Sequence, residues 1–275
     1  PNIGLKKALS IEEYVNKIPM IIGSNRDEVK FWLAFSEYFV TVDSSRGYSF
    51  GLPRIVIKDE DAYEAFNYYR STAWKLRGVD DPLQSLIKAG NKNLYSYRFD
   101  WDDQRKFIIA DFKKLFGATH ALEIPLLIGD NALVGGRPVS NFVYPRGFSK
   151  LFISRNMMKF WTNFAKNDHP GHSTNNIKWE PYLNNENDLF NFMILDNRKN
   201  LKMSSSKTSL NKLSKELFLD NRLTEKEKCV VLFQMLTYVG DDIYEENIKD
   251  YKGKCNRRIS EQFIKDNANS VNIEY

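Results

Sequence analysis

Three short apolar segments separated by long helical stretches are the feature that most constrains the fold of this chain. They are 19–24 (PMIIGS), 93–101 (NLYSYRFDW) and 192–196 (FMILD), and their lengths and residue types predict buried strands. Few buried strands that alternate with long helices are typical of an α/β fold with a mostly parallel sheet. Three strands make a thin sheet for 275 residues, so we expect this sheet to be part of a larger one.

Helical periodicity accounts for most of the remaining chain. The spacing of apolar residues predicts helices over 27–39, 59–77, 81–89, 103–117 and 154–167, and from Thr224 onwards. Thr224 and Glu227 have the spacing of a capping box, and Gly117 is suited to end the helix over 103–117. Polar composition predicts a linker over 197–222, followed by a C-terminal helix and a polar tail over 223–275.

Charge and cysteine content limit the classes of partner. The net charge is +5, with 40 basic and 35 acidic residues interspersed, which predicts a mixed solvated surface and no nucleic-acid partner. Apolar runs stay below the roughly 18 residues that a membrane span requires, so we expect no transmembrane segment in this chain. Cys229 and Cys255 either pair or remain separate thiols, and the sequence leaves both states open.

Two adjacent carboxylates follow the first predicted strand. Function in α/β sheets collects just past the carboxyl ends of strands, which makes Asp27 and Glu28 candidates for chemistry. The alternative is that both satisfy free amides at the start of a helix, and spacing alone favours that structural role.

The three histidines lie in two different contexts. His169 and His172 lie in a loop rich in Pro, Gly and Asn, and without a third ligand they predict an exposed loop rather than a metal site. His120 is flanked by small residues, which lets another group approach its ring. Glu28 and His120 together have the residue types of the acid–base pair in a nucleophilic triad.

Segments of this chain resemble, in the same order, segments of the type-B carboxylesterases, the α/β-hydrolase family that includes cholinesterases and bile-salt-activated lipases. IPMIIGSNRDE (18–28) resembles the strand and turn that carry the catalytic acid, and GATHALEIPLLIG (117–129) resembles the histidine segment. MMKFWTNFAKNDHP (157–170) with KWEPYL (178–183) resembles the family's W-x-x-F-A helix and its later W-x-x-Y. FMILD (192–196) fits the short strand that follows.

The resemblance implies a fold and two catalytic residues. Residues 1–196 would be the C-terminal half of a type-B carboxylesterase catalytic domain. This is the C-terminal part of an α/β-hydrolase fold, with few mostly parallel strands flanked by many helices. Glu28 would be the triad acid and His120 the general base, and no cofactor would be needed. Val29 and Ala121 depart from the family, in which many members have Gly after the acid and after the histidine, and either change narrows the pocket.

The resemblance also implies roles for residues around the site. Glu123 would anchor the histidine loop, and Trp161 and Phe164 would pack in the core. Candidate walls of the ester pocket on this half are Phe31, Trp32 and Phe35. Ordinary packing of a helix face is the plainer interpretation for at least two of these three.

The nucleophile expected of such a triad is absent from the chain. In α/β-hydrolases a serine lies in G-x-S-x-G, and the chain order is Ser, then acid, then His. The sequence has no G-x-S-x-G; GFSK at 147–150 lacks the second glycine and follows the histidine. VGG at 134–136 is a poor match to the oxyanion-hole loop. We therefore expect the nucleophile and the oxyanion hole in a missing N-terminal half of the same domain, upstream of Pro1.

Three functions are compatible with this sequence. The first is a serine-dependent carboxylic ester hydrolase acting on a small-molecule or lipid ester, with this chain alone inactive. The second is a non-catalytic adhesion or binding protein that resembles neuroligins, against which the presence of Glu28 and His120 argues. The third is a mature subunit that pairs with a separate N-terminal chain.

Overall fold

The computed structural model describes residues 18–43, 54–130, 136–183, 188–236, 246–251 and 253–255, and positions 258, 262, 263 and 265. The chain forms two compact units. Unit 1 consists of Pro1–Arg26, Lys75–Arg105 and Ala121–Lys207. Unit 2 consists of Asp27–Trp74, Lys106–His120 and Thr208–Tyr275.

Unit 1 contains a sheet of four described strands. β1 (Met20–Asn25), β4 (Leu94–Phe99) and β7 (Phe190–Leu195) are parallel neighbours in that order, and β8 (Lys202–Ser206) pairs antiparallel with β7. The three strands expected from the sequence are confirmed, as is the α/β class. β1 forms one edge of this described sheet, which is where a further parallel strand of a larger sheet would pair.

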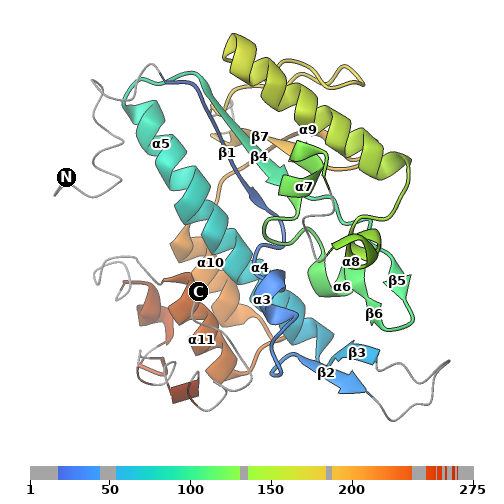
Figure 1. Ribbon diagram of the computed structural model, residues 1–275. Coiled ribbons are helices and arrows are strands. Elements are labelled where there is room, and N and C mark those ends of the chain that lie inside the picture. The colour runs from blue at the N-terminus through green and yellow to red at the C-terminus, as the bar shows by residue number, and fades with distance from the viewer. Residues whose placement is uncertain are drawn as a thin grey trace. The chain divides into compact units, whose positions relative to one another are not determined.

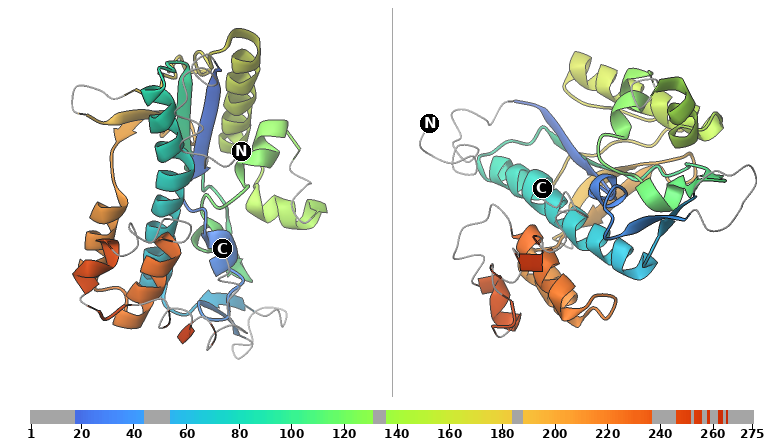
Figure 2. Two further views of the ribbon diagram at one scale, coloured as in Figure 1. Left: turned by 90° about the vertical axis from the view of Figure 1, so that its left-hand side faces the viewer. Right: turned by 60° about the horizontal axis from the view of Figure 1, so that its bottom comes forward.

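Helices cover both faces of the unit 1 sheet, as Figures 1 and 2 show for α5 and α9. The described helices of this unit are η2 (Leu76–Asp80), α5 (Asp81–Lys88), α7 (Glu123–Ile128), α8 (Gly136–Val143) and α9 (Phe148–Asn167). The side chains of strand β4 point to the two faces of the sheet in turn, so β4 contacts helices on both faces. Leu94 packs in a buried cluster with α5, while the rings of Tyr95 and Tyr97 contact Phe164 and Trp161 of α9.

Unit 2 is built around α4. Its described elements are α3 (Lys30–Leu33), β2 (Val40–Asp43), β3 (Arg54–Ile57), α4 (Glu60–Lys75), β5 (Lys106–Phe107), β6 (Ala110–Asp111), α6 (Phe112–Phe116), α10 (Leu210–Leu219), α11 (Glu225–Met235) and η4 (Lys249–Tyr251). β2 pairs antiparallel with β3, and β5 with β6. Thr224 and Glu227 form the expected capping box at the start of α11. Cys229 and Cys255, whose state the sequence left open, form a disulfide.

Two helix predictions were largely wrong. Only Lys30–Leu33 is helical within 27–39, because backbone groups of Asp27 and Glu28 pair with the loop that carries His120 instead of with a helix. Within 103–117 the chain first forms the β5–β6 hairpin, and helix α6 begins only after Asp111, whose side chain caps it. In both places tertiary partners override the local periodicity.

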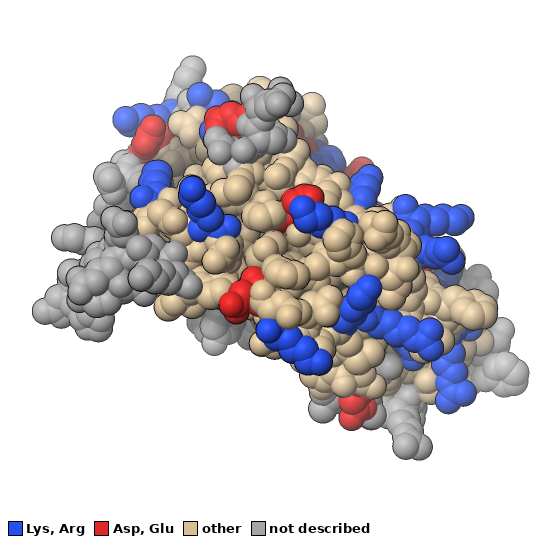
Figure 3. All heavy atoms as spheres, turned by 90° about the horizontal axis from the view of Figure 1, so that it is seen from above, with Lys and Arg blue, Asp and Glu red and all other residues tan. Residues whose placement is uncertain are grey.

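The C-terminal part is more structured than its composition indicates. The polar segment 197–222 contains strand β8 and helix α10, and Ser209 caps α10 by accepting a hydrogen bond from the Lys212 amide. Much of the expected polar tail lies outside the described residues, as do Val134 and Gly135 of the VGG segment. Among the described helices, none combines the length and the apolar character needed to traverse a bilayer. On the face drawn in Figure 3, Lys and Arg prevail over Asp and Glu, and the two charges are interspersed.

Candidate active site

The acid candidate and the histidine candidate are hydrogen-bonded in unit 2. A carboxylate oxygen of Glu28 lies 2.7 Å from Nδ1 of His120. The Glu28 side chain is only 6% exposed, whereas the His120 side chain is 43% exposed. When Nδ1–H donates to the carboxylate, Nε2 is the ring nitrogen that can accept a proton. This is the arrangement by which an acid fixes the tautomer of a general base.

Asp27 connects the turn that carries Glu28 to the loop that carries His120. Its carboxylate accepts hydrogen bonds from the side chain of Asn67 at 2.7 Å and from the Ala118 amide at 2.9 Å. Its own amide donates to the Ala118 carbonyl at 3.0 Å, and the His120 amide donates to the Glu28 carbonyl at 3.3 Å. Asp27 is therefore not the helix cap that we expected, but the residue that sets the register of the two segments.

Gly117 is required by this close approach. Its backbone has φ +51°, a region that favours glycine, and a Cβ atom there would lie 2.3 Å from an Asp27 carboxylate oxygen. The expectation that Gly117 ends a helix is confirmed, since it follows α6 directly. The same residue lets the histidine loop lie against the acid turn.

One face of helix α4 supports the residues on both sides of Glu28. Asn67 donates to Asp27, Ser71 donates to Asn67 at 3.0 Å, and the Val29 amide donates to the Ser71 hydroxyl at 3.3 Å. These bonds hold the backbone immediately before and after the acid. Spacings of four residues along a helix place side chains on one face, which is how two short polar residues of α4 reach one turn.

Two tryptophans lie against the His120 ring. The ring centroid of Trp32 lies 5.2 Å from that of His120, and the centroid of Trp74 lies 5.5 Å from it. Trp74 lies three residues beyond Ser71 on α4, so the same helix orients the acid turn and the imidazole. Aromatic faces stabilise a neighbouring cation, and His120 becomes one when it accepts a proton.

The other expected residues are found in several settings. Phe31 and Phe35 are 43% and 70% exposed, so they are not buried core residues. Glu123 accepts a hydrogen bond from the Asn25 side chain at 2.5 Å, at the end of β1. His169 and His172 are exposed in their loop, as predicted. Within the described part of the chain, His, Cys, Asp and Glu side chains form no group of three that could hold a metal ion.

Three supporting residues were missed by the sequence analysis: Asn67, Ser71 and Trp74. Their signal was present, because Asn67 and Ser71 are small polar residues four apart on a helix face that is otherwise mostly alanine and aromatic. Both are buried, at 3% exposure each. Buried polar side chains require partners, so their position on α4 indicates that this face meets another polar segment.

A comparison with models of protein families shows to which family this chain belongs. The model of the carboxylesterase family matches residues 61–216, more than half of the chain. The chain belongs to the carboxylesterase family. This confirms the resemblance drawn from the sequence. The matched range includes His120, whereas Glu28 lies before it.

Solved structures similar to this chain include three esterases. One is a thermophilic pNB esterase, 19% identical, with 73% of this chain and 38% of that chain covered and a TM-score of 0.40. A second structure of a pNB esterase is 18% identical, with 73% of this chain and 38% of that chain covered and a TM-score of 0.38. The third is an esterase from Clostridium hathewayi described as able to hydrolyse aliphatic aromatic polyesters. It is 16% identical, with 69% of this chain and 35% of that chain covered and a TM-score of 0.41. The chain thus spans well under half the length of these structures. Among curated proteins none matches.

Proposed function

We propose that the protein to which this chain belongs is a serine-dependent carboxylic ester hydrolase in which Glu28 and His120 are the acid and the general base. The observation that carries the proposal is the 2.7 Å contact between the buried Glu28 carboxylate and Nδ1 of the accessible His120. Membership of the carboxylesterase family supports ester hydrolysis as the reaction class. The chain has no G-x-S-x-G segment, and we propose that an upstream segment of the same domain supplies the serine.

In the proposed mechanism, Nε2 of His120 takes the proton of the serine hydroxyl as its oxygen attacks the ester carbonyl. The resulting imidazolium returns that proton to the alkoxide that leaves, and an acyl-enzyme remains. His120 then removes a proton from water, which attacks the acyl group and releases the carboxylic acid. Glu28 keeps its negative charge throughout, holds the ring by Nδ1–H and stabilises the imidazolium.

Neighbouring residues of this chain limit which nitrogen of the His120 imidazole can transfer a proton. Trp32 and Trp74 contact the ring in tilted orientations, and Glu28 holds it at Nδ1. Because the ring is held on these sides, Nε2 is the nitrogen that remains for proton transfer. A preoriented base of this kind lowers the entropy cost of reaching the transition state.

Labelling with a fluorophosphonate tests the proposal, because this probe reacts covalently with a serine that a general base activates. The protein encoded by the complete open reading frame around this chain should be labelled at one serine. His120→Gln should abolish the labelling, and His169→Gln, a matched change in an exposed loop, should leave it intact. A folded protein that the probe does not label, or one that His120→Gln labels as fast as the parent, would contradict the proposal and favour a binding function on this fold.

A further inference from the structure

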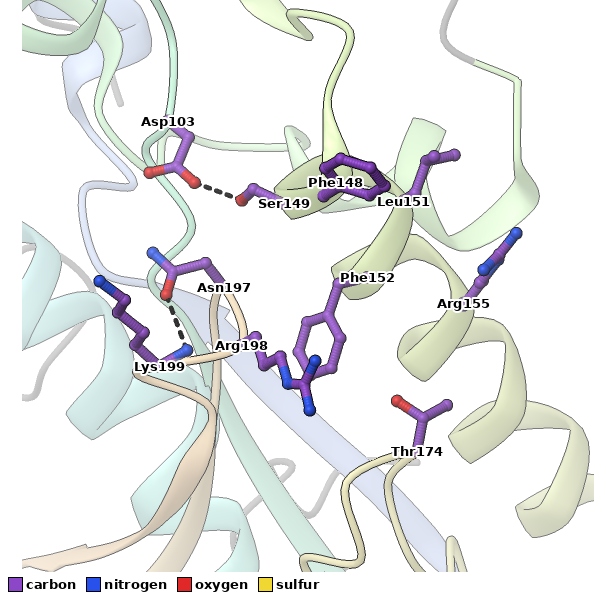
Figure 4. Close-up of a pocket in the computed structure, with 10 residues that line it drawn as sticks. All are labelled: Asp103, Phe148, Ser149, Leu151, Phe152, Arg155, Thr174, Asn197, Arg198 and Lys199. Atoms are coloured by element: carbon purple, nitrogen blue, oxygen red, sulfur yellow. Dashed lines mark hydrogen bonds between the residues drawn. The ribbon is translucent and has the colours of Figure 1, made fainter.

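Unit 1 contains a cavity of about 700 Å³ that no step of the proposed reaction uses (Figure 4). Its lining residues come from the first turns of α9, from the loop after α9 and from the turns that follow β4 and β7: Asp103, Phe148, Ser149, Leu151, Phe152, Arg155, Thr174, Asn197, Arg198 and Lys199. A volume of this size suits a small organic ligand.

The cavity lies at the edge of the sheet where α/β proteins bind ligands. Asp103 follows the carboxyl end of β4, and Asn197 follows the carboxyl end of β7. Crevices outside the carboxyl ends of parallel strands are the usual ligand sites of such sheets. The position of the cavity therefore favours a bound molecule over an accidental gap between helices.

One wall of the cavity is apolar and exposed. Phe148, Leu151 and Phe152 have the three- and four-residue spacing of one helix face, and Figure 4 shows them projecting from α9. Phe148 is 92% exposed and Leu151 is 48% exposed. Large apolar side chains exposed together in a hollow gain free energy when a hydrocarbon group covers them.

The neutral polar groups of the lining already have partners within the protein. Ser149 donates a hydrogen bond to the Asp103 carboxylate, and the Asn197 side chain accepts one from the Lys199 amide at 3.1 Å. Thr174 accepts one from the Asn156 side chain at 3.0 Å. These groups are thus less available to a ligand than the charged side chains are.

The charged side chains of the lining are mostly cationic. The lining contains three cationic residues, Arg155, Arg198 and Lys199, and one anionic residue, Asp103. Among the described residues, Asp103 is bonded to Ser149, whereas the side chains of the three cations take part in no ion pair. Figure 4 shows Arg198 and Lys199 on the turn across the cavity from α9. A guanidinium near an apolar wall matches an anion attached to a hydrocarbon body.

We propose that this cavity binds an amphipathic monocarboxylate, with the carboxylate at Arg198 and the apolar body against Phe148, Leu151 and Phe152. Arginine side chains would fit a phosphate head group equally well. The choice of a carboxylate rests on the proposed function, because a carboxylic acid with an apolar body is the product class of an ester hydrolase. The binding itself needs no catalysis, so it can be tested separately from the reaction.

Calorimetric titration of the chain with four probes tests the proposal. Octanoate carries both the charge and the tail, octanol lacks the charge, acetate lacks the tail, and octyl phosphate changes the head group. We expect saturable binding of octanoate and at least tenfold weaker binding of octanol and acetate.

Matched variants locate the site. Arg198→Gln should weaken octanoate binding about tenfold, whereas Lys166→Gln, at the other end of α9, should not change it. Leu151→Ser should weaken it as well, whereas Leu219→Ser, the same change at a 73% exposed residue of α10, should not. All four positions are on the surface, so loss of folding is not the expected cause of any change.

Several results would overturn the proposal. They are the absence of saturable octanoate binding, equal binding of octanol, and binding that neither Arg198→Gln nor Leu151→Ser weakens. Binding of octyl phosphate without octanoate would refute the carboxylate assignment. Each of these can occur whether or not the fluorophosphonate labels a serine, so failure of this inference and failure of the proposed function are distinguishable.

Discussion

His120 Nδ1 lies 2.7 Å from the Glu28 carboxylate, although 92 residues separate the two along the chain. The contact is maintained by elements around it and not by the pair alone. Asp27 fixes the register of the two loops, Gly117 permits their close approach, and one face of α4 supports the acid turn.

The hydrogen bond between Asp27 and Asn67 should be exchangeable. Asp27→Asn places a second amide against Asn67 and should lower the free energy of unfolding by about 2 kcal/mol, because a buried donor loses its acceptor. Asn67→Asp should also lower the free energy of unfolding, since it brings two carboxylates together. The double variant Asp27→Asn/Asn67→Asp restores one donor and one acceptor, and should recover at least half of the summed loss in urea unfolding. Strictly additive losses would mean that the two side chains do not act as a pair.

Trp74 should orient the imidazole during turnover. Trp74→Ala removes one of the two rings beside His120 and should lower kcat about tenfold with little change in KM, a loss within the range of one desolvated cation–π contact. Trp74→Phe keeps an aromatic ring at this position and should lower kcat less than Trp74→Ala does. Tyr68→Ala, on the same helix at a 46% exposed position, is the control and should leave kcat unchanged. Equal effects of Trp74→Ala and Tyr68→Ala would indicate a general effect on α4.

The proton between His120 and Glu28 should be visible by NMR. An imidazole N–H held by a carboxylate gives a proton resonance far downfield, and the chain has only three histidines to assign. We expect such a resonance from His120 and none from the exposed His169 and His172. Glu28→Gln should remove it. If the resonance survives that change, Glu28 is not the partner of Nδ1.

The pair of Asp220 and Arg222 should give a pH-dependent contribution to stability. The hydrogen bond from Arg222 is the largest of the effects that lower the pKa of Asp220 to about 2. A depressed pKa stabilises the folded state above the unfolded value of about 3.9, and this contribution is lost as the pH falls towards 2.

Arg222→Gln should therefore destabilise the chain at pH 7 by less than about 1 kcal/mol, the range of an exposed ion pair. The difference from the parent should shrink as the pH falls below 4. Arg198→Gln, whose residue has no ion pair among the described residues, should show no such dependence. A difference for Arg222→Gln that is constant from pH 7 to pH 3 would refute this account of Asp220.

The sequence predicted local features well and tertiary features poorly, for a physical reason. The strands at Met20–Asn25 and Leu94–Phe99 coincide with short apolar runs in the sequence, and the helix after Thr224 carries its own cap, so their signals are local. The acid turn has the periodicity of a helix, yet its backbone is bonded to a loop about 90 residues away. Periodicity contains no information about such a partner.

Parts of the candidate site were predictable only from family resemblance. Glu28 and His120 were identified in that way, since composition alone cannot bring them together. Asn67, Ser71 and Trp74 were accessible in principle from polar residues spaced along an apolar helix face. The pairing of Cys229 with Cys255 depends on where the chain after α11 returns, which the sequence did not indicate.

The central claim is that Glu28 holds His120 for ester hydrolysis, and steady-state kinetics test it most directly. We would measure hydrolysis of p-nitrophenyl butyrate by the protein encoded by the complete reading frame, comparing Glu28→Gln with Glu60→Gln, the same change at an exposed residue of α4. The account predicts that Glu28→Gln lowers kcat by about three to four orders of magnitude while the protein stays folded, and that Glu60→Gln has no effect. A kcat of Glu28→Gln within a few-fold of the parent value would contradict it.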